Sequence, residues 1–222
     1  PFQSCLGLET QPHSMGYDYH EMNTDDFVAL CRLIGAEPFI TINPAWNTPR
    51  ESAMWVEYCN GGPDTEYGKI RIERGYEEPY HVQFWSLGNE FGYGHMEGDN
   101  TPYGYSRTAR EHADAMRNVC KELTFCSSGP YPNKEWSDYS SLTSLHYYAP
   151  QREFTLRENL EEDYRICLAG VEKAREKIHT MRSQLGNSTQ ISFDEWNTWY
   201  AWYRPSCITD GIFTALMLHM II

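Results

Sequence analysis

The chain has 222 residues, of which 41% are apolar and 22% charged, a composition typical of a globular domain with a hydrophobic core. Its formal net charge of -13 argues against nucleic-acid binding, because phosphate recognition needs concentrated lysine and arginine. The seven cysteines are scattered and form no C-x-x-C pair. They indicate neither a disulfide framework nor a zinc ribbon, and they lean towards a reducing, cytoplasmic setting.

The first predicted helix begins after Thr24 and ends at Gly35. Its apolar residues recur at the spacing of one helix face and are Phe27, Leu30, Cys31 and Ile34. A short strand is predicted over residues 37–43. A capping-box pattern at Thr48 then starts a second helix that runs to about Cys59.

The middle of the chain continues the alternation. Residues 63–80 are predicted to form turns, and residues 82–87 to form a strand. A helix opens at Thr101 and Pro102, with His112 on its apolar face as a satisfied core residue. Brief strands follow over residues 123–127 and 142–147.

The last third is predicted to hold a long helix over residues 157–185, a strand over residues 190–193 and a final helix capped by Thr209 or Asp210. The closing apolar run, residues 211–222, is too short for a bilayer span, which needs about 20 residues. The chain starts without methionine and stops inside this run. We therefore expect a fragment of a longer protein.

Strands that alternate with helices predict parallel strands joined by crossover helices. No G-x-G-x-x-G opens a helix, which disfavours a nucleotide-binding doubly wound sheet. We therefore predict an α/β fold of the (β/α)8 TIM-barrel type, incomplete here with about five strand–helix units. The expected organisation is one catalytic barrel domain over residues 1–222, truncated at both ends.

Four predicted strand ends carry polar residues, in chain order Asn43, Asn89 with Glu90, His146 to Tyr148, and Asp194 to Asn197. A barrel places its active site at these ends. Cleavage of a glycosidic bond needs two carboxyl groups, one to protonate the leaving oxygen and one to attack the anomeric carbon. Glu90 and Glu195 fit because each follows an apolar strand. On the residues alone, Asn89 fits a turn equally well, and one carboxylate at 194–195 fits a helix cap.

Residues 85–90 read WSLGNE and resemble the acid/base motif of glycoside hydrolase family 51, the α-L-arabinofuranosidases. Residues 191–200 read ISFDEWNTWY and are similar to that family's nucleophile motif. Further similarity lies in residues 33–38 and 55–60. The resemblance covers most of the chain. It implies a retaining (β/α)8 barrel, with the acid/base after strand 4, the nucleophile after strand 7, and a β-sandwich domain beyond the present C-terminus.

Carried over residue by residue, the resemblance implies that Glu90 is the general acid/base and Glu195 the nucleophile. It implies that Asn89 hydrogen-bonds the 2-OH of the sugar, an interaction that strengthens in the transition state. His146 and Tyr148 match positions that in the family support the nucleophile and contact the sugar.

Asn43 stands where the family places a sugar-contacting asparagine. Residues 44–47 and residues 91–98 depart from the family's pattern, which leaves the retaining mechanism intact and the sugar and leaving-group site open. Trp196 borders Glu195, so it lines the sugar site or fills the core.

The expected reaction is double displacement by an exo-acting α-L-arabinofuranosidase, with the two carboxyls roughly 5 Å apart. The expected ligand is carbohydrate, with no cofactor, no metal, no nucleic acid and no membrane. The resemblance suggests a homo-oligomer in the full-length protein. Two alternatives stay open: another retaining hydrolase of the clan, such as a β-xylosidase or endoglucanase, and a non-catalytic carbohydrate-binding barrel.

Overall fold

The structure, a computed structural model, describes residues 9–10, 17–18, 22–91, 101–128, 139–149, 160–187, 189–198 and 207–222. The chain divides into two compact units. Unit 1 comprises Pro1–Tyr131 and Glu135–Leu142, and unit 2 comprises Pro132–Lys134 and Thr143–Ile222. The single barrel domain expected over the whole chain stays a prediction.

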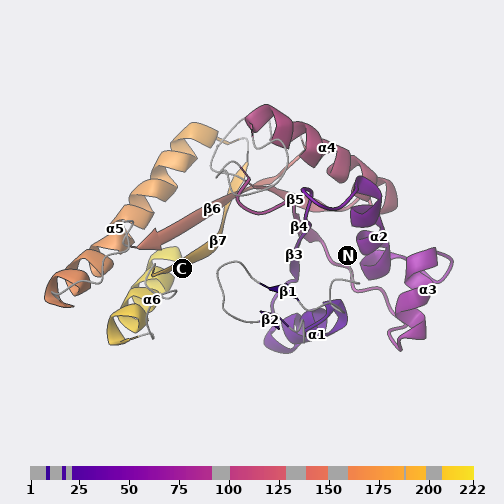
Figure 1. The fold of residues 1–222 in the computed structure, drawn as a ribbon, viewed down its shortest axis with the longest axis horizontal. Coiled ribbons are helices and arrows are strands. Elements are labelled where there is room, and N and C mark those ends of the chain that lie inside the picture. The colour runs from indigo at the N-terminus through magenta and orange to yellow at the C-terminus, as the bar shows by residue number, and fades with distance from the viewer. Residues whose placement is uncertain are drawn as a thin grey trace. The chain divides into compact units, whose positions relative to one another are not determined.

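Unit 1 contains a parallel sheet and the helices between its strands (Figure 1). Its elements are β1 (Glu9–Thr10), β2 (Tyr17–Asp18), α1 (Thr24–Ile34), β3 (Phe39–Thr41), α2 (Pro49–Asn60), α3 (Glu66–Glu73), β4 (Phe84–Ser86), α4 (Pro102–Val119) and β5 (Thr124–Ser127). β1 and β2 form a separate antiparallel pair. The parallel strands follow chain order, β3-β4-β5.

The core of unit 1 forms where the helices pack on this sheet. Trp85 in β4 is paired with Ile40 in β3 and with Phe125 in β5, and all three side chains are buried. Val56 from α2 and Met116 from α4 belong to the same buried cluster. Burial of this apolar surface is the main force that holds the helices on the sheet.

The N-cap residue of helix α1 lies one residue before Thr24, the cap that the sequence predicts. Asn23 is the N-cap residue, and its side chain accepts hydrogen bonds from two backbone amides of the first turn. The predicted apolar face is partly wrong, because Leu30 and Ile34 are exposed whereas Val28 is buried together with Cys31. Asp25 in the first turn is buried and accepts hydrogen bonds from the hydroxyls of Tyr58 and Tyr80, so polar contacts as well as apolar residues orient the helix.

The prediction that residues 63–80 form turns is wrong, because helix α3 lies within them. Thr65 caps α3 by accepting a hydrogen bond from the amide of Gly68. Arg71 is fully buried, and its Nη1 donates to the carbonyls of Tyr58 and Gly61, at 2.8 Å each. A buried arginine that binds backbone carbonyls holds this helix, so it needs little of the apolar periodicity that predicts helices from sequence.

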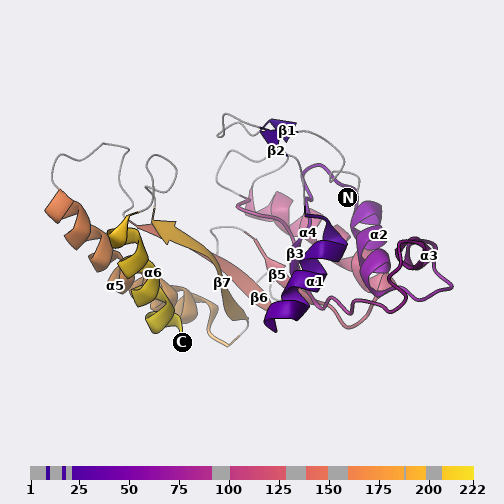
Figure 2. The same ribbon diagram turned by 90° about the horizontal axis from the view of Figure 1, so that it is seen from below.

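Unit 2 contains two strands and two long helices. They are β6 (Leu142–Ala149, whose first residue falls in unit 1), α5 (Leu160–Leu185), β7 (Gln190–Thr198) and α6 (Ile208–Ile221). α5 and α6 lie side by side in both views (Figures 1 and 2). Their facing residues Val171 and Phe213 share a buried cluster with Ala149 of β6. Gly170 permits close contact, since a Cβ there would lie 2.5 Å from that of Ala149.

Side-chain contacts show that β6 and β7 run in the same direction. Thr143 meets Thr189 near the start of both strands at 3.0 Å, and Tyr148 meets Glu195 further along at 2.7 Å. The strands of each unit therefore alternate with helices in chain order, as in an incomplete (β/α)8 barrel. β7 is longer than predicted and contains Glu195 rather than ending before it.

The caps of the last helices give one confirmed and one wrong prediction. Helix α5 ends at Leu185, as predicted, and Gly186 follows it with a φ of 60°, the left-handed conformation common after helices. The N-cap of α6 is Cys207, so Thr209 and Asp210 lie inside the first turn. Asp210 accepts a hydrogen bond from the amide of Cys207 at 2.7 Å. In the part of the chain that the structure describes, no helix is both long and apolar enough to cross a membrane.

Candidate active site

Glu90 lies in a constrained turn directly after β4. Gly88 has a φ of 109°, and a Cβ there would lie 2.7 Å from the ring of Phe91. Glu90 itself has a φ of 51°, which is uncommon for a residue with a side chain and recurs at functional sites. Its side chain is half-buried, whereas Asn89 is exposed. The turn thus fixes the backbone that presents Glu90.

Asn43 follows β3 and lies in the loop next to that turn. Its side chain is exposed, and its Oδ1 accepts a hydrogen bond from the amide of Ala45 at 3.2 Å. The next residue, Pro44, places its Cγ only 3.2 Å from the position of a Cβ on Gly88. Within unit 1, the structure therefore places the loops of Asn43 and Glu90 side by side, at the ends of the paired strands β3 and β4.

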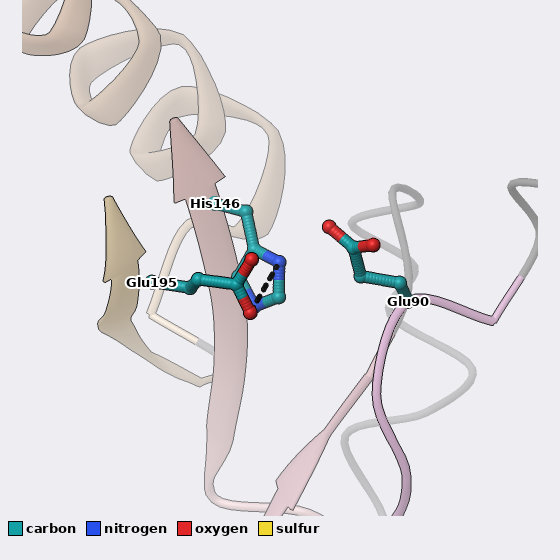
Figure 3. A group of neighbouring side chains, drawn as sticks. All are labelled: Glu90, His146 and Glu195. Carbon is teal, nitrogen blue, oxygen red and sulfur yellow. Dashed lines mark ion pairs between the residues drawn. The ribbon is translucent and has the colours of Figure 1, made fainter. Parts of the chain in front are cut away.

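In unit 2, Glu195 is bound by two side chains of the neighbouring strand. The hydroxyl of Tyr148 donates to Oε1 of Glu195 at 2.7 Å. Nδ1 of His146 lies 3.5 Å from Oε2, the ion pair drawn as a dashed line in Figure 3. Figure 3 also draws Glu90 on the chain that follows β4. Both oxygens of Glu195 thus have a partner, which orients the carboxylate.

A second carboxylate, Asp194, contacts the same row of β6 side chains. Its Oδ1 accepts from the hydroxyl of Ser144 at 2.8 Å and lies 3.5 Å from Nε2 of His146. Its Oδ2 accepts from Ser192 at 3.1 Å. Asp194 and Glu195 thus face different nitrogens of the His146 ring, at 3.5 Å each. That no metal or cofactor is needed stays a prediction.

Sequence reasoning did not assign these contacts to Ser144 and Asp194. The available signal was the alternation Ser144, His146, Tyr148, since residues two apart on a strand share a face. The sequence predicts Asp194 at a strand end, with a helix cap as the alternative for one carboxylate at 194–195, and in the structure both residues lie within β7.

Helix α5 supports β6 behind this cluster. Nζ of Lys177 donates to the carbonyl oxygen of His146 at 2.9 Å and lies 5.9 Å from the centre of the Tyr147 ring. Burial lowers the pKa of Lys177, because desolvation disfavours the charged amine. Burial also raises the pKa of Tyr147 to about 12. The strand that carries His146 is therefore held from its helix side.

Trp196 is half-buried and packs edge-on against Phe213 of α6, with ring centres 6.4 Å apart. The ring of Trp196 thus packs against the core of unit 2. A role of Trp196 in sugar binding stays a prediction. The loop over residues 92–98 and the end of the second motif, residues 199–200, lie outside the described residues. Glu90 and Glu195 belong to different units, so their expected separation also stays a prediction.

Comparison with known families decides what kind of protein carries these residues. Residues 6–165 match the family described as the alpha-L-arabinofuranosidase 1 domain. The chain belongs to the alpha-L-arabinofuranosidase family. The resemblance to glycoside hydrolase family 51 is thereby confirmed, and its two motifs contain Glu90 and Glu195.

Known alpha-L-arabinofuranosidases match most of this chain. A probable alpha-L-arabinofuranosidase C of Aspergillus terreus is 29% identical over 210 residues, which cover 83% of this chain and 41% of the relative. An intracellular exo-alpha-(1->5)-L-arabinofuranosidase of Acetivibrio thermocellus is 27% identical over 200 residues, which cover 82% of this chain and 39% of the relative.

Solved alpha-L-arabinofuranosidase structures also match the fold. The enzyme of Thermotoga maritima in complex with arabinose has a TM-score of 0.77 and 27% identity, over 98% of this chain and 48% of that one. The family 51 enzyme of Thermotoga petrophila gives 0.77 and 28%, over the same shares of both chains. The predicted barrel fold is confirmed, and the chain spans less than half the length of these relatives.

Proposed function

We propose that the full-length protein is a retaining exo-acting α-L-arabinofuranosidase that uses Glu195 as nucleophile and Glu90 as general acid/base. The observation that carries the proposal is that Tyr148 and His146 each contact one carboxylate oxygen of Glu195, in a chain of this family. A nucleophile must present one carboxylate oxygen to the anomeric carbon in a fixed direction, and these contacts supply that orientation.

The reaction proceeds in two displacements. Glu195 attacks the anomeric carbon as a carboxylate while Glu90 gives a proton to the leaving oxygen, so the glycosidic bond breaks and a glycosyl ester forms. Glu90, now ionised, then takes a proton from water. The resulting attack by the water oxygen on the same carbon releases the sugar and restores both carboxyl groups.

The contacts in unit 2 support this sequence of charges. Glu195 changes from an anion to a neutral ester and back, and the Tyr148 hydroxyl can donate to the anion and release it as the ester forms. On the other unit, the constrained turn at Gly88 and Glu90 keeps the acid/base from adjusting freely. Asn89, exposed beside it, is available for the 2-OH of the sugar.

The proposed substrates are arabinose-containing oligosaccharides and polysaccharides of plant type. The name of the Acetivibrio thermocellus relative, an exo-alpha-(1->5)-L-arabinofuranosidase, supports α-1,5-linked arabinan as a first choice. A homo-oligomeric full-length enzyme is proposed on the family resemblance alone.

The test is hydrolysis of an aryl α-L-arabinofuranoside by the full-length protein beside its Glu195→Gln variant. We expect turnover by the parent, with retention of configuration in the first-formed product by proton NMR, and a loss of about 10³-fold or more in the variant. Arg175→Gln, which changes an exposed ion pair on α5, is the matched control and should keep full activity.

Three results would contradict the proposal. Turnover of aryl xylosides or β-glucans in place of the arabinofuranoside would favour another retaining hydrolase. Sugar binding without hydrolysis by the folded parent would favour the non-catalytic barrel. An inverted product would exclude the double displacement.

A further inference from the structure

The loop after β3 displays a tryptophan that the core of unit 1 does not cover. Trp46 is 68% exposed. The turn around it is held by Asn43, whose Oδ1 accepts from the amide of Ala45 at 3.2 Å and whose carbonyl accepts from the amide of Asn47 at 2.9 Å. A large aromatic ring that an ordered turn leaves exposed is available to contact a ligand.

This turn lies beside the loop of the acid/base. β3 and β4 are parallel neighbours, with Thr41 opposite Ser86, so the segments that follow them leave the same edge of the sheet. Pro44 lies beside Gly88, two residues before Glu90, since its Cγ is 3.2 Å from the position that a Cβ on Gly88 would take. The exposed ring of Trp46 is therefore presented at the edge of unit 1 from which Glu90 acts.

The chemistry of the reaction says which part of a substrate reaches this edge. An acid/base protonates the oxygen that departs with the leaving group, so the leaving-group sugar lies on its side of the bond. Aromatic rings bind the apolar C–H face of a sugar ring by stacking. We propose that Trp46 is a platform for the leaving-group sugar, an inference that rests on the proposed function.

The proposed sugar platform is particular to this chain because of where Trp46 lies in the sequence. It falls within residues 44–47, which depart from the family's pattern, so the family resemblance assigns no role to it. A platform there would raise the preference for substrates whose leaving group is a sugar ring.

The test compares two substrates of the full-length enzyme that differ only in the leaving group, α-1,5-arabinobiose and α-L-arabinofuranosyl fluoride. We expect Trp46→Ala to lower kcat/KM for arabinobiose roughly tenfold and to leave kcat/KM for the fluoride unchanged within about twofold. Trp46→Phe should recover part of the loss. Leu33→Ala, at an exposed apolar residue near the end of α1, is the control and should change neither rate.

Equal losses on both substrates, or no loss on either, would overturn the platform. Failure of the parent enzyme to cleave the fluoride would instead contradict the proposed function, so the two failures are distinguishable.

A different observation concerns unit 2. Asp194 lies 3.5 Å from Nε2 of His146, the ring that meets Glu195 through Nδ1 at the same distance. The carboxylate of Asp194 is itself fixed by the hydroxyls of Ser144 and Ser192. The side chains of His146 and Asp194 are only 12% and 19% exposed, so solvent screens their interaction little.

A histidine that supports a functional group needs its ring orientation fixed by a partner at the other nitrogen. We infer that Asp194 is a positioning residue, which holds the ring of His146 so that Nδ1 faces Glu195. This inference also rests on the proposed assignment of Glu195 as nucleophile.

A double-mutant cycle in the full-length enzyme tests whether Asp194 acts through His146. We expect Asp194→Ala to lower kcat for an aryl arabinofuranoside about tenfold or more with KM little changed, because orientation affects the attack rather than binding. Asp194→Asn, which keeps an oxygen acceptor, should recover much of the activity. In a His146→Ala background, Asp194→Ala should cost little more.

Glu172→Gln on α5, an exposed carboxylate in an ion pair with Arg175, is the control and should leave kcat unchanged. Independent effects of Asp194→Ala and His146→Ala, which multiply in the double variant, would overturn the inference. An Asp194→Asn variant as inactive as Asp194→Ala would do the same. A parent without activity would contradict the proposed function itself.

Discussion

The hydroxyl of Tyr148 donates a 2.7 Å hydrogen bond to Oε1 of Glu195, across two neighbouring strands of unit 2. The bond joins the end of β6 to the motif that the family resemblance assigned to the nucleophile. A Tyr148→Phe substitution removes this hydrogen bond without changing the charge of the site, so the contribution of the bond to catalysis can be measured.

Tyr148→Phe should therefore reduce catalysis more than binding. A hydrogen bond to a charged group contributes roughly 1.5–3 kcal/mol, so kcat should fall about 10- to 100-fold with a smaller change in KM. Steady-state kinetics on an aryl arabinofuranoside measures both. Tyr164→Phe, at an exposed tyrosine of α5, should leave kcat intact, and an unchanged kcat in Tyr148→Phe would show that the bond has no role in turnover.

Gly88→Ala should damage both stability and activity. The φ of 109° is disfavoured for any residue with a side chain, and the new Cβ would lie 2.7 Å from the Phe91 ring and 3.2 Å from Pro44. We expect a loss of about 2 kcal/mol or more in stability, seen as a lower thermal midpoint, together with reduced kcat because Glu90 is displaced. Gly62→Ala is the control, since a Cβ there would meet nothing within 4 Å. Equal midpoints for the two variants would refute the strain argument.

The buried pair of His112 and Ser52 predicts how unit 1 responds to acid. His112 is 1% exposed, and its Nδ1 lies 2.8 Å from Oγ of Ser52, which confirms it as a satisfied core residue. Burial lowers the pKa of His112 from 6.5 to about 4. Between pH 6.5 and 4, His112 is therefore protonated in the unfolded chain but neutral in the folded chain. The folded state keeps its full stability above about pH 6.5 and loses stability as the pH falls towards 4.

The loss of stability between pH 6.5 and 4 amounts to about 3 kcal/mol. His112→Gln should flatten the fall in thermal midpoint between pH 6.5 and 4 relative to the parent enzyme. His179→Gln, at an exposed histidine of α5, should leave the fall as it is. A parent and a His112→Gln variant with parallel pH profiles would contradict the assignment.

Local patterns were sufficient to predict most of the elements. The apolar residues of β4 and α4 fall at strand and helix spacing, and α5 ends at Leu185, as predicted. These predictions succeed because each depends on residues close together in the sequence. The row of His146 and Tyr148 follows in the same way from the alternation of side chains along a strand.

The features that could not be predicted depend on contacts between distant residues. Helix α3 is held by Arg71, whose carbonyl partners include Tyr58, thirteen residues earlier in the chain. The first turn of α1 is oriented by Asp25, a buried carboxylate that accepts from the hydroxyl of Tyr80 at 2.8 Å and pairs with Arg74. Polar networks of this kind leave no periodic pattern in the sequence.

The most direct test of the central claim is to trap the glycosyl-enzyme. In the full-length Glu90→Ala variant, a dinitrophenyl α-L-arabinofuranoside needs no acid to leave, but water then lacks its base, so the ester should accumulate. Peptide mass spectrometry should find one arabinosyl group on Glu195. An adduct on another residue, or steady turnover without any adduct, would contradict Glu195 as the nucleophile and Glu90 as its acid/base.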